Sequence, residues 1–249
     1  MVNSVQRAAA ILGLLLKEKR LGLSQVARSL RIPKSTAHSI LETLEREGLV
    51  ARDESTGTFC LGIRLLELGQ AAQENFELRR VASPHLLALN RELDETVHLT
   101  VLDGDVVLYV ECFESSRRLR TYSVIGVRGP LHCTAVGKAI LAFLDDDEQI
   151  RLVNRIPLER FTSHTITGRT ALRAHLKEVR ARGWSVDDVE HEEGVRCVGA
   201  PVFDHLGRVC ASISISGPTQ RITTGALPGL AEKARAAALA ISRTLGFRG

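Results

Sequence analysis

The chain has 249 residues, of which 44% are hydrophobic and 25% are charged. This balance is typical of a folded globular protein and excludes a disordered one, and the length favours two modest domains. No apolar run approaches the roughly 18 residues of a membrane span. Arg7 and the charges at 17–19 also interrupt the first apolar segment, so no signal peptide is predicted. We therefore expect a cytoplasmic protein without a membrane anchor.

Positive charge is concentrated at the N-terminus. Residues 1–52 hold nine Lys and Arg side chains against four Asp and Glu, a net charge of +5. The rest of the chain holds 24 basic and 25 acidic side chains, a net charge of −1. This asymmetry favours an N-terminal module that binds a polyanion, followed by a near-neutral second domain.

The cysteines number five and include no C-x-x-C pair, which argues against a disulfide framework and against a zinc finger. Reduced thiols are expected. Metal binding by His132 and Cys133 with a third residue stays open, although adjacent side chains rarely point at one ion. No cofactor is expected.

Two helices are predicted at the N-terminus. Apolar residues that share one helical face predict a first helix over 4–17. After a turn at 21–22, Ser24 is a suitable N-cap for a short second helix. This helix is expected to end at the turn before Pro33, because proline disfavours helix in the residue that precedes it.

A third helix is predicted to follow at once. Its buried stripe falls at i, i+3, i+4 and i+7, which are Ala37, Ile40, Leu41 and Leu44. Gly48 is expected at its C-terminal cap. Strands over 49–52 and 58–61, separated by a turn at 55–57, predict a hairpin. Three helices and a hairpin make a winged helix-turn-helix.

The exposed side of the third helix begins with compact hydrogen-bond donors. This pattern suits contact with phosphates and base edges, and a merely solvated helix face is the alternative. The donors at the front of this predicted recognition helix are Lys34, Ser35, Thr36 and His38, followed by Ser39. Further contacts are expected from Arg46 near its end, and phosphate contacts from Arg52 and Thr56 in the hairpin and from Gln6 and Arg7 on the first helix.

The next segment, 63–95, is predicted to be a helical linker that restarts at Pro84. A hairpin is expected next, with strands over 98–102 and 106–110 flanking Asp103-Gly104-Asp105, and a further strand over 119–125.

The last part of the chain mixes helices and strands. Helices are predicted over 134–144 and over 172–182, where Gly183 ends the second, and a last helix over 227–245. Strands are predicted over 197–203 and 208–216. The second half is therefore expected to be an α+β domain with a mostly antiparallel sheet.

Several features of this domain favour a small anionic ligand. The helix that starts near Thr134 is expected to offer free backbone N–H groups at Ala135, Val136 and Gly137 and the positive end of its dipole, which suit a carboxylate. In the strand 208–216, the hydroxyls of Ser212, Ser214 and Ser216 alternate with apolar residues and line one face. Cys197 begins the neighbouring strand. A solvent-facing sheet surface is the alternative for the serines, and a small buried hydrophobic residue is the alternative for the cysteine.

The chain resembles the isocitrate-lyase-regulator (IclR) family of bacterial transcription factors in motifs that keep their order over nearly its whole length: SVQRAAAIL, LSQVARSLRIPKSTAHSILETLEREGLV, GPLHCTAVGKAILAFL and GVRCVGAPVFD…GRVCASISISGP. The resemblance implies a winged helix-turn-helix over 1–66, a helical linker over 67–80 and a GAF-like or profilin-like α+β effector-binding domain over 81–249. It also implies a regulator that represses or activates catabolic genes in response to a small organic or aromatic acid. Repression is predicted here, and activation is the alternative. Such proteins bind a palindromic operator in double-stranded DNA as homodimers, which often pair into tetramers.

The resemblance also implies ligand-binding positions. In the family, a Cys in the G-[VL]-x-C motif, two Ser of the following strand, an Asp ten residues before the Cys and the start of the G-K-A helix surround the effector. The matching residues here are Cys197, Ser212, Ser214, Asp187, Val136 and Gly137. Ser39 departs from the family, where Arg is frequent, so operator sequences do not transfer. Further candidates for contact with the ligand are Tyr122, Arg128 and His132, and a position at the surface or in the core is the alternative for each.

Two other classes of function are weighed. A cysteine-dependent enzyme for small acids would use Cys197 or Cys133 with His132 or His191, oriented by Asp187. No G-x-S-x-G, H-E-x-x-H or P-loop signature supports it, and it leaves the basic module unexplained. A sequence-independent DNA-binding protein would explain the charge but not the second domain. A ligand-responsive regulator, not an enzyme, is therefore predicted.

Overall fold

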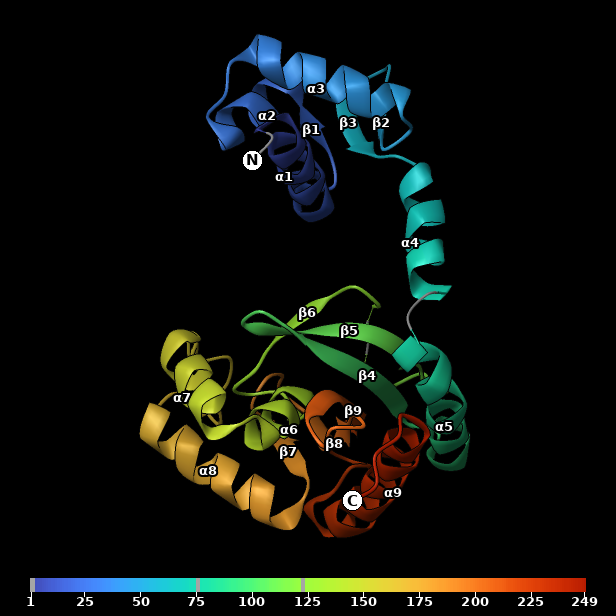
Figure 1. Ribbon diagram of the computed structural model, residues 1–249, viewed down its shortest axis with the longest axis vertical. Helices are drawn as coiled ribbons and strands as arrows, with labels where there is room; N and C mark the ends of the chain where they lie inside the picture. The colour runs from blue at the N-terminus through green and yellow to red at the C-terminus, as the bar shows by residue number, and fades with distance from the viewer. Residues whose placement is uncertain (1–2, 75–76, 122–123) are drawn as a thin grey trace. The chain divides into compact units, whose positions relative to one another are not determined.

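The computed structural model describes residues 3–74, 77–121 and 124–249. The chain forms two compact units, Met1–Phe76 and Glu77–Gly249, each with its own elements (Figure 1). The boundary between them lies inside the predicted linker 67–80. No helix in the described ranges is long and apolar enough to cross a membrane.

The N-terminal unit begins with a three-helix cluster and a small antiparallel sheet in the order β1-β3-β2, and α4 (Arg64–Glu74) follows them. Apolar residues of the helices and of the hairpin, among them Ile11, Leu41 and Phe59, form one core. This is the predicted winged helix-turn-helix. Its elements are α1 (Asn3–Glu18), β1 (Leu21–Gly22), α2 (Leu23–Leu30), α3 (Lys34–Arg46), β2 (Val50–Asp53) and β3 (Thr58–Leu61).

The start of α2 differs from the prediction. Ser24 lies inside the helix, and the N-cap is Gly22, whose N–H donates to the Gln25 side chain at 2.8 Å. The prediction of a Ser24 cap is wrong because Leu21 and Gly22 pair with Phe59 and Thr58 of β3. This pairing holds the chain extended up to the residue before the helix.

Two glycines allow the backbone before the hairpin to approach the backbone after it. Gly48 follows the C-cap residue Glu47 with φ +70°, the left-handed conformation that glycine adopts without strain. Gly62, after β3, donates its N–H to Leu49 O at 2.9 Å. A Cβ on Gly62 would overlap the carbonyl oxygen of Gly48, so only glycine fits this close approach.

The predicted helical segment forms α4 (Arg64–Glu74) and α5 (Glu77–Leu93). The predicted restart at Pro84 is wrong, because α5 runs through this residue. Its missing N–H removes one helical hydrogen bond. The helix still continues because Ala82, Leu86 and Leu89 are buried in the core of the C-terminal unit.

Strands of the C-terminal unit form one antiparallel sheet in the order β6-β5-β4-β9-β8-β7. One face of the sheet packs against α5 and α9, and α6 covers the other face with α7 and α8 beyond it (Figure 1). The α+β fold with an antiparallel sheet is as predicted. The elements are β4 (Thr96–Asp103), β5 (Val106–Phe113), β6 (Arg128–Pro130), α6 (Ala135–Phe143), α7 (Asp146–Arg155), α8 (Arg169–Arg182), β7 (Ser185–Asp188), β8 (Val195–Phe203), β9 (Val209–Pro218), the 3-10 turn η1 (Thr224–Ala226) and α9 (Leu227–Thr244).

The predicted strand over 119–125 is wrong in its described part, since 119–121 and 124–125 are irregular and the next strand begins at Arg128. Asp94 explains the course of the chain before it. Its carboxylate accepts hydrogen bonds from the Ser116 N–H at 2.8 Å and from Arg117 Nε at 3.1 Å, which hold this segment away from the sheet ladder. Helix α7 and strand β7 were not predicted.

A substitution at Gly62 tests the close approach that shapes the hairpin. We expect Gly62→Ala to lower the free energy of unfolding by about 1–3 kcal/mol, because the overlap with the Gly48 carbonyl forces the backbone apart. Gly13 in α1 is the matched control: nothing lies near the Cβ that it would gain, so Gly13→Ala should stabilise by about 0.5–1 kcal/mol. Urea denaturation measures both, and a Gly62→Ala protein as stable as the wild type would contradict the prediction.

Candidate functional site

The front of α3 presents the predicted DNA-contacting residues to solvent. Lys34, Ser35, His38 and Ser39 are exposed and Thr36 is half-buried, while Ala37, Leu41 and Leu44 on the opposite side are buried. His38 Nδ1 lies 3.9 Å from Glu42 Oε2, a long contact that leaves the ring accessible. Arg46 is exposed near the helix end.

The hairpin turn is organised by Asp53, which the sequence analysis did not single out. Its Oδ1 accepts hydrogen bonds from the Ser55 hydroxyl at 2.6 Å and from the N–H groups of Ser55 and Thr56 at 3.0 and 3.3 Å. Arg20 donates to Oδ2 at 2.5 Å. The bonds from Ser55 and Arg20 lower the pKa of Asp53 to about 2. An Asp two residues before a Ser in a predicted turn was the available signal.

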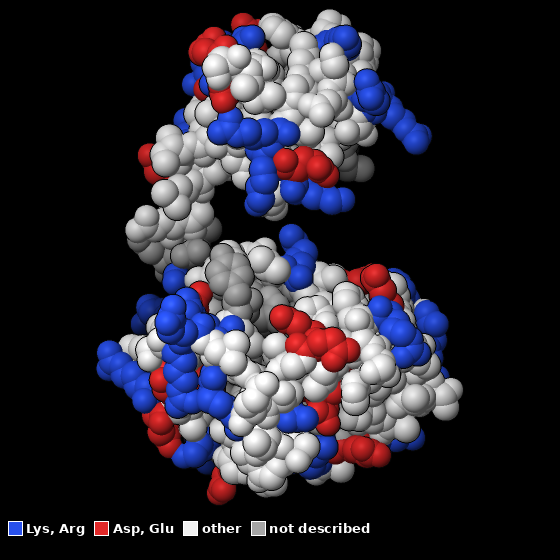
Figure 2. All heavy atoms as spheres, turned by 180° about the vertical axis from the view of Figure 1, so that it is seen from behind, with Lys and Arg blue, Asp and Glu red and all other residues white. Residues whose placement is uncertain are grey.

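The remaining predicted contacts also lie on the surface of the N-terminal unit. Arg52 and Thr56 in the hairpin are exposed, as are Gln6 and Arg7 on α1. Arg52 also stacks over the Phe59 ring, with its guanidinium carbon 5.7 Å from the ring centroid. Figure 2 shows Lys and Arg side chains at several places on one face of this unit, with Asp and Glu among them.

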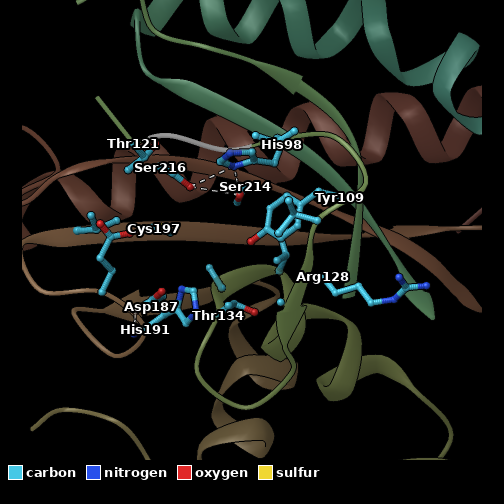
Figure 3. A pocket seen from close by; sticks show the side chains of 17 residues that line it. His98, Tyr109, Thr121, Arg128, Thr134, Asp187, His191, Cys197, Ser214 and Ser216 are labelled. Atoms are coloured by element: carbon cyan, nitrogen blue, oxygen red, sulfur yellow. Dashed lines mark hydrogen bonds between the residues drawn. The ribbon is translucent and has the colours of Figure 1, made fainter. Parts of the chain in front are cut away.

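A cavity of about 230 Å³ lies in the C-terminal unit, between the first turn of α6 and the polar face of the sheet (Figure 3). It is lined by four of the predicted effector-binding residues: Val136, Asp187, Cys197 and Ser214. Ser212 and Gly137 do not line it. Ser216 does, so the second serine at the cavity is Ser216 rather than Ser212.

The first turn of α6 is capped by Thr134. The Thr134 hydroxyl accepts a hydrogen bond from the Gly137 N–H at 3.1 Å and donates to Pro130 O at 2.7 Å. The expectation of a free N–H at Gly137 is therefore wrong, whereas Ala135 and Val136 line the cavity. A Cβ on Gly137 would lie 2.5 Å from Leu131 O, so this glycine allows a close backbone approach.

Ser212 of β9 connects α6 to the sheet. Its hydroxyl donates to Val136 O at 2.9 Å and lies 2.8 Å from the Thr100 hydroxyl. Ser212 is fully buried, and Val136 is the residue through which it acts on the cavity. Ser212 therefore holds α6 against the sheet, and its predicted contact with the effector stays a prediction.

Asp187, Cys197 and Ser216 lie side by side on three strands. Asp187 of β7 pairs with Cys197 of β8, which in turn pairs with Ser216 of β9. The two residues are ten positions apart in the sequence because the connection from β7 to β8 brings the chain back so that Cys197 lies opposite Asp187. The thiol is a neutral group, because burial raises the pKa of Cys197 above its ordinary value.

Asp187 is buried at the edge of the cavity. Its Oδ1 accepts hydrogen bonds from the N–H groups of Glu190 at 2.8 Å and His191 at 3.3 Å. Burial raises the pKa of Asp187 to about 7, against the opposing effect of the Lys138 charge. The carboxyl group therefore changes its charge near neutral pH.

A buried ion pair lies next to Asp187. Lys138 of α6 is fully buried and donates to Glu190, whose backbone carbonyl accepts a hydrogen bond from the Thr165 hydroxyl at 2.6 Å. The pair fixes the loop after β7 against α6. This ion pair was not predicted, although a Lys within the apolar run TAVGKAILAFL was a signal for it.

Two further cavity residues were missed on β4 and β5. His98 and Tyr109 line the cavity, and their rings meet edge to face with centroids 5.2 Å apart. Thr96, His98 and Thr100 alternate with apolar residues in the same way as the serines of β9. This alternation was the available signal.

Of the three further candidates for contact with the ligand, the structure describes Arg128 and His132. Arg128 lines the cavity, but its guanidinium pairs with Asp103 and points away from the other labelled side chains (Figure 3). His132 Nε2 is hydrogen-bonded to Glu159 O at 2.9 Å, and His132 does not line the cavity. Tyr122 falls outside the described residues. Within the described ranges, no three His, Cys, Asp or Glu side chains are arranged to hold a metal ion.

Comparison with known proteins decides the family. Residues 4–54 match the model of the IclR helix-turn-helix domain, and residues 70–243 match the model of the bacterial transcriptional regulator IclR C-terminal domain. The chain belongs to the IclR family. Its members KdgR and XynR are HTH-type transcriptional regulators, so this IclR protein is a DNA-binding transcription regulator and not an enzyme.

The similarity to individual relatives extends over nearly the whole chain. KdgR of Escherichia coli (strain K12) is 37% identical over 246 residues, which cover 99% of this chain and 94% of KdgR. The crystal structure of Thermotoga maritima IclR is 32% identical, covers 99% of this chain and 100% of that one, and superposes with a TM-score of 0.78. An IclR homologue from Microbacterium hydrocarbonoxydans, solved in complex with 4-hydroxybenzoate, is 25% identical with a TM-score of 0.82 and covers 98% of this chain and 99% of that one.

Replacing Ser212 tests its supporting role. We expect Ser212→Ala to lower the free energy of unfolding by about 1–3 kcal/mol, because the buried Thr100 hydroxyl loses a partner and Val136 loses its link to the sheet. Ser163→Ala, at an exposed position, is the control and should stay within about 0.5 kcal/mol of the wild type. Chemical denaturation measures both, and equal stabilities of the two variants would refute the role.

Proposed function

We propose that this IclR protein is a cytoplasmic repressor of a catabolic operon whose operator affinity is set by a small organic or aromatic acid. It binds a palindromic operator as a homodimer or as a dimer of dimers. The observation that carries the proposal is the cavity at the first turn of α6, with backbone N–H groups at one side and buried hydroxyls at the other.

The operator contacts follow from the exposed face of α3. Ser35, Thr36 and His38 enter the major groove and read base edges, while Lys34 approaches the phosphates. Arg52 and Thr56 of the hairpin, Arg46, and Gln6 and Arg7 of α1 supply positioning contacts. Ser39 adds a hydroxyl to the reading face without adding charge.

The effector is held by its carboxylate at α6. The N–H groups of Ala135 and Val136 and the positive end of the helix dipole favour an anion there. Ser214 lines the cavity on the side opposite the first turn of α6, and Asp187 and Cys197 line its edge. The cavity is smaller than the roughly 300–1,000 Å³ of most drug-sized sites, which suits an acid of few carbon atoms or a single ring. The 4-hydroxybenzoate complex of the Microbacterium homologue supports this ligand class.

The proposed switch is a difference in effector affinity between operator-bound and free states of the protein. A thermal-shift screen of small carboxylic acids on the full chain, followed by operator titrations with each acid that raises Tm, tests it. An acid that binds should change the operator affinity. The switch is refuted when every acid that binds leaves the operator affinity as it was.

Salt dependence tests the electrostatic part of operator binding. When each protomer of a dimer neutralises three or four phosphates, log K falls against log salt with a slope of about −6. Lys34→Ala should make this slope less negative by about 2 per dimer, because each protomer loses one phosphate contact. Lys177→Ala removes the same charge from an exposed site on α8 and is the matched control. Equal slopes for the two variants, or a wild-type slope near zero, would contradict the assignment.

The titration of Asp187 predicts how effector binding depends on pH. Above its pKa of about 7 the Asp187 carboxylate repels an anionic ligand, and below it the neutral carboxyl does not. The affinity for a carboxylic acid should therefore rise as pH falls from 8 to 6, by at most about tenfold per unit. Calorimetric titration measures this dependence. Asp187→Asn should bind with little change over the same range, and a wild-type affinity independent of pH would contradict the prediction.

A further inference from the structure

His98 has a hydrogen-bonding atom without a partner at the cavity. The residue is 3% exposed, and its Nδ1 lies 3.1 Å from the Ser214 hydroxyl and 3.3 Å from the Ser216 hydroxyl. Its Nε2 is buried and has no hydrogen-bond partner among the described residues. His98 is one of the residues that line the cavity. Burying a polar atom without a partner is costly, so an unpaired buried nitrogen on a lining side chain points to a group that a bound ligand supplies.

The protonation state of His98 follows from its surroundings. Burial lowers the pKa of His98 to about 4, so the ring is neutral near pH 7 and only one nitrogen carries a proton. The hydroxyls of Ser214 and Ser216 both face Nδ1, and an unprotonated Nδ1 gives them an acceptor. The proton then resides on Nε2, which becomes a donor.

The position of His98 separates it from the anion-binding end of the cavity. Figure 3 shows His98 together with Ser214 and Ser216 on one side, and Thr134, Asp187 and His191 on the other. Tyr109 packs edge to face against the His98 ring and limits its rotation. A ligand held by its carboxylate at the first turn of α6 would direct its far end toward His98.

We propose that His98 is a specificity-determining residue whose Nε2–H donates to a second oxygen of the effector, remote from the carboxylate. The inference rests on the proposed acid-binding function and narrows it. The site selects acids with a hydroxyl or oxo group beyond the carbon next to the carboxylate, over parent acids without that oxygen. A site built to bond a ligand oxygen disfavours the analogue that lacks it, because the buried donor then stays unpaired.

Matched pairs of acids test this selection on the full chain. Suitable pairs are 4-hydroxybenzoate with benzoate and 4-oxopentanoate with pentanoate, titrated by calorimetry. The oxygenated member should bind about 10- to 100-fold more tightly, as expected for one buried hydrogen bond. Equal affinity within every pair that binds would overturn the proposal.

Substitutions of His98 separate recognition from support of the fold. His98→Phe keeps a ring beside Tyr109 but removes both nitrogens, so the preference for the oxygenated acid over its parent acid should vanish. His98→Gln keeps an N–H donor and should restore part of the preference. A preference that survives unchanged in His98→Phe overturns the proposal. Should this variant not fold, an undiminished preference in a folded His98→Ala protein does so.

The outcomes also separate this inference from the proposed function. When the parent and oxygenated acids bind equally and both change the operator affinity, the acid-responsive function stands and the role of His98 is refuted. When no acid of either kind binds while the protein still binds its operator, the acid-responsive function fails, and the role of His98 fails with it.

Discussion

The attachment of the first turn of α6 to the sheet determines the cavity. The Ser185 hydroxyl donates to Ala135 O at 2.5 Å, and the Ser212 hydroxyl donates to Val136 O at 2.9 Å. Gly199 on β8 permits this approach, since a Cβ there would lie 2.7 Å from Ala135 O. These contacts hold the helix by its carbonyl groups, so the N–H groups of the same turn remain for a ligand.

The fold was predictable wherever the signal was local. Helix α3, its glycine stop and the hairpin after it follow from periodicity and turn residues within short stretches. The prediction was wrong where tertiary packing overrode local preference. Pro84 lies inside α5 because the apolar face of that helix is buried, and Ser24 lost the cap position because β1 pairs with β3. The mostly polar α7 gave too weak an apolar pattern to be predicted.

The site was predictable only in part. Its residues come together because paired strands place them opposite one another, and the register of that pairing is not visible in the sequence. The family resemblance pointed to Asp187, Cys197 and Ser214, which line the cavity. Which serine of β9 faces the ligand depends on where α6 crosses the sheet, and a single strand does not reveal this. His98 showed the same alternation as the serines, but its pairing with Ser214 joins β4 to β9 across more than a hundred residues.

A ligand anion at the first turn of α6 is the central claim, and hydrogen exchange at single amides tests it most directly. When a carboxylic acid that raises Tm is bound, NMR should show slower hydrogen exchange at the backbone amides of Ala135 and Val136. The resonances of these two amides should also shift. Gly137, already bonded to Thr134, should respond less. An acid that binds the protein while the amides of Ala135 and Val136 stay unchanged would contradict the account.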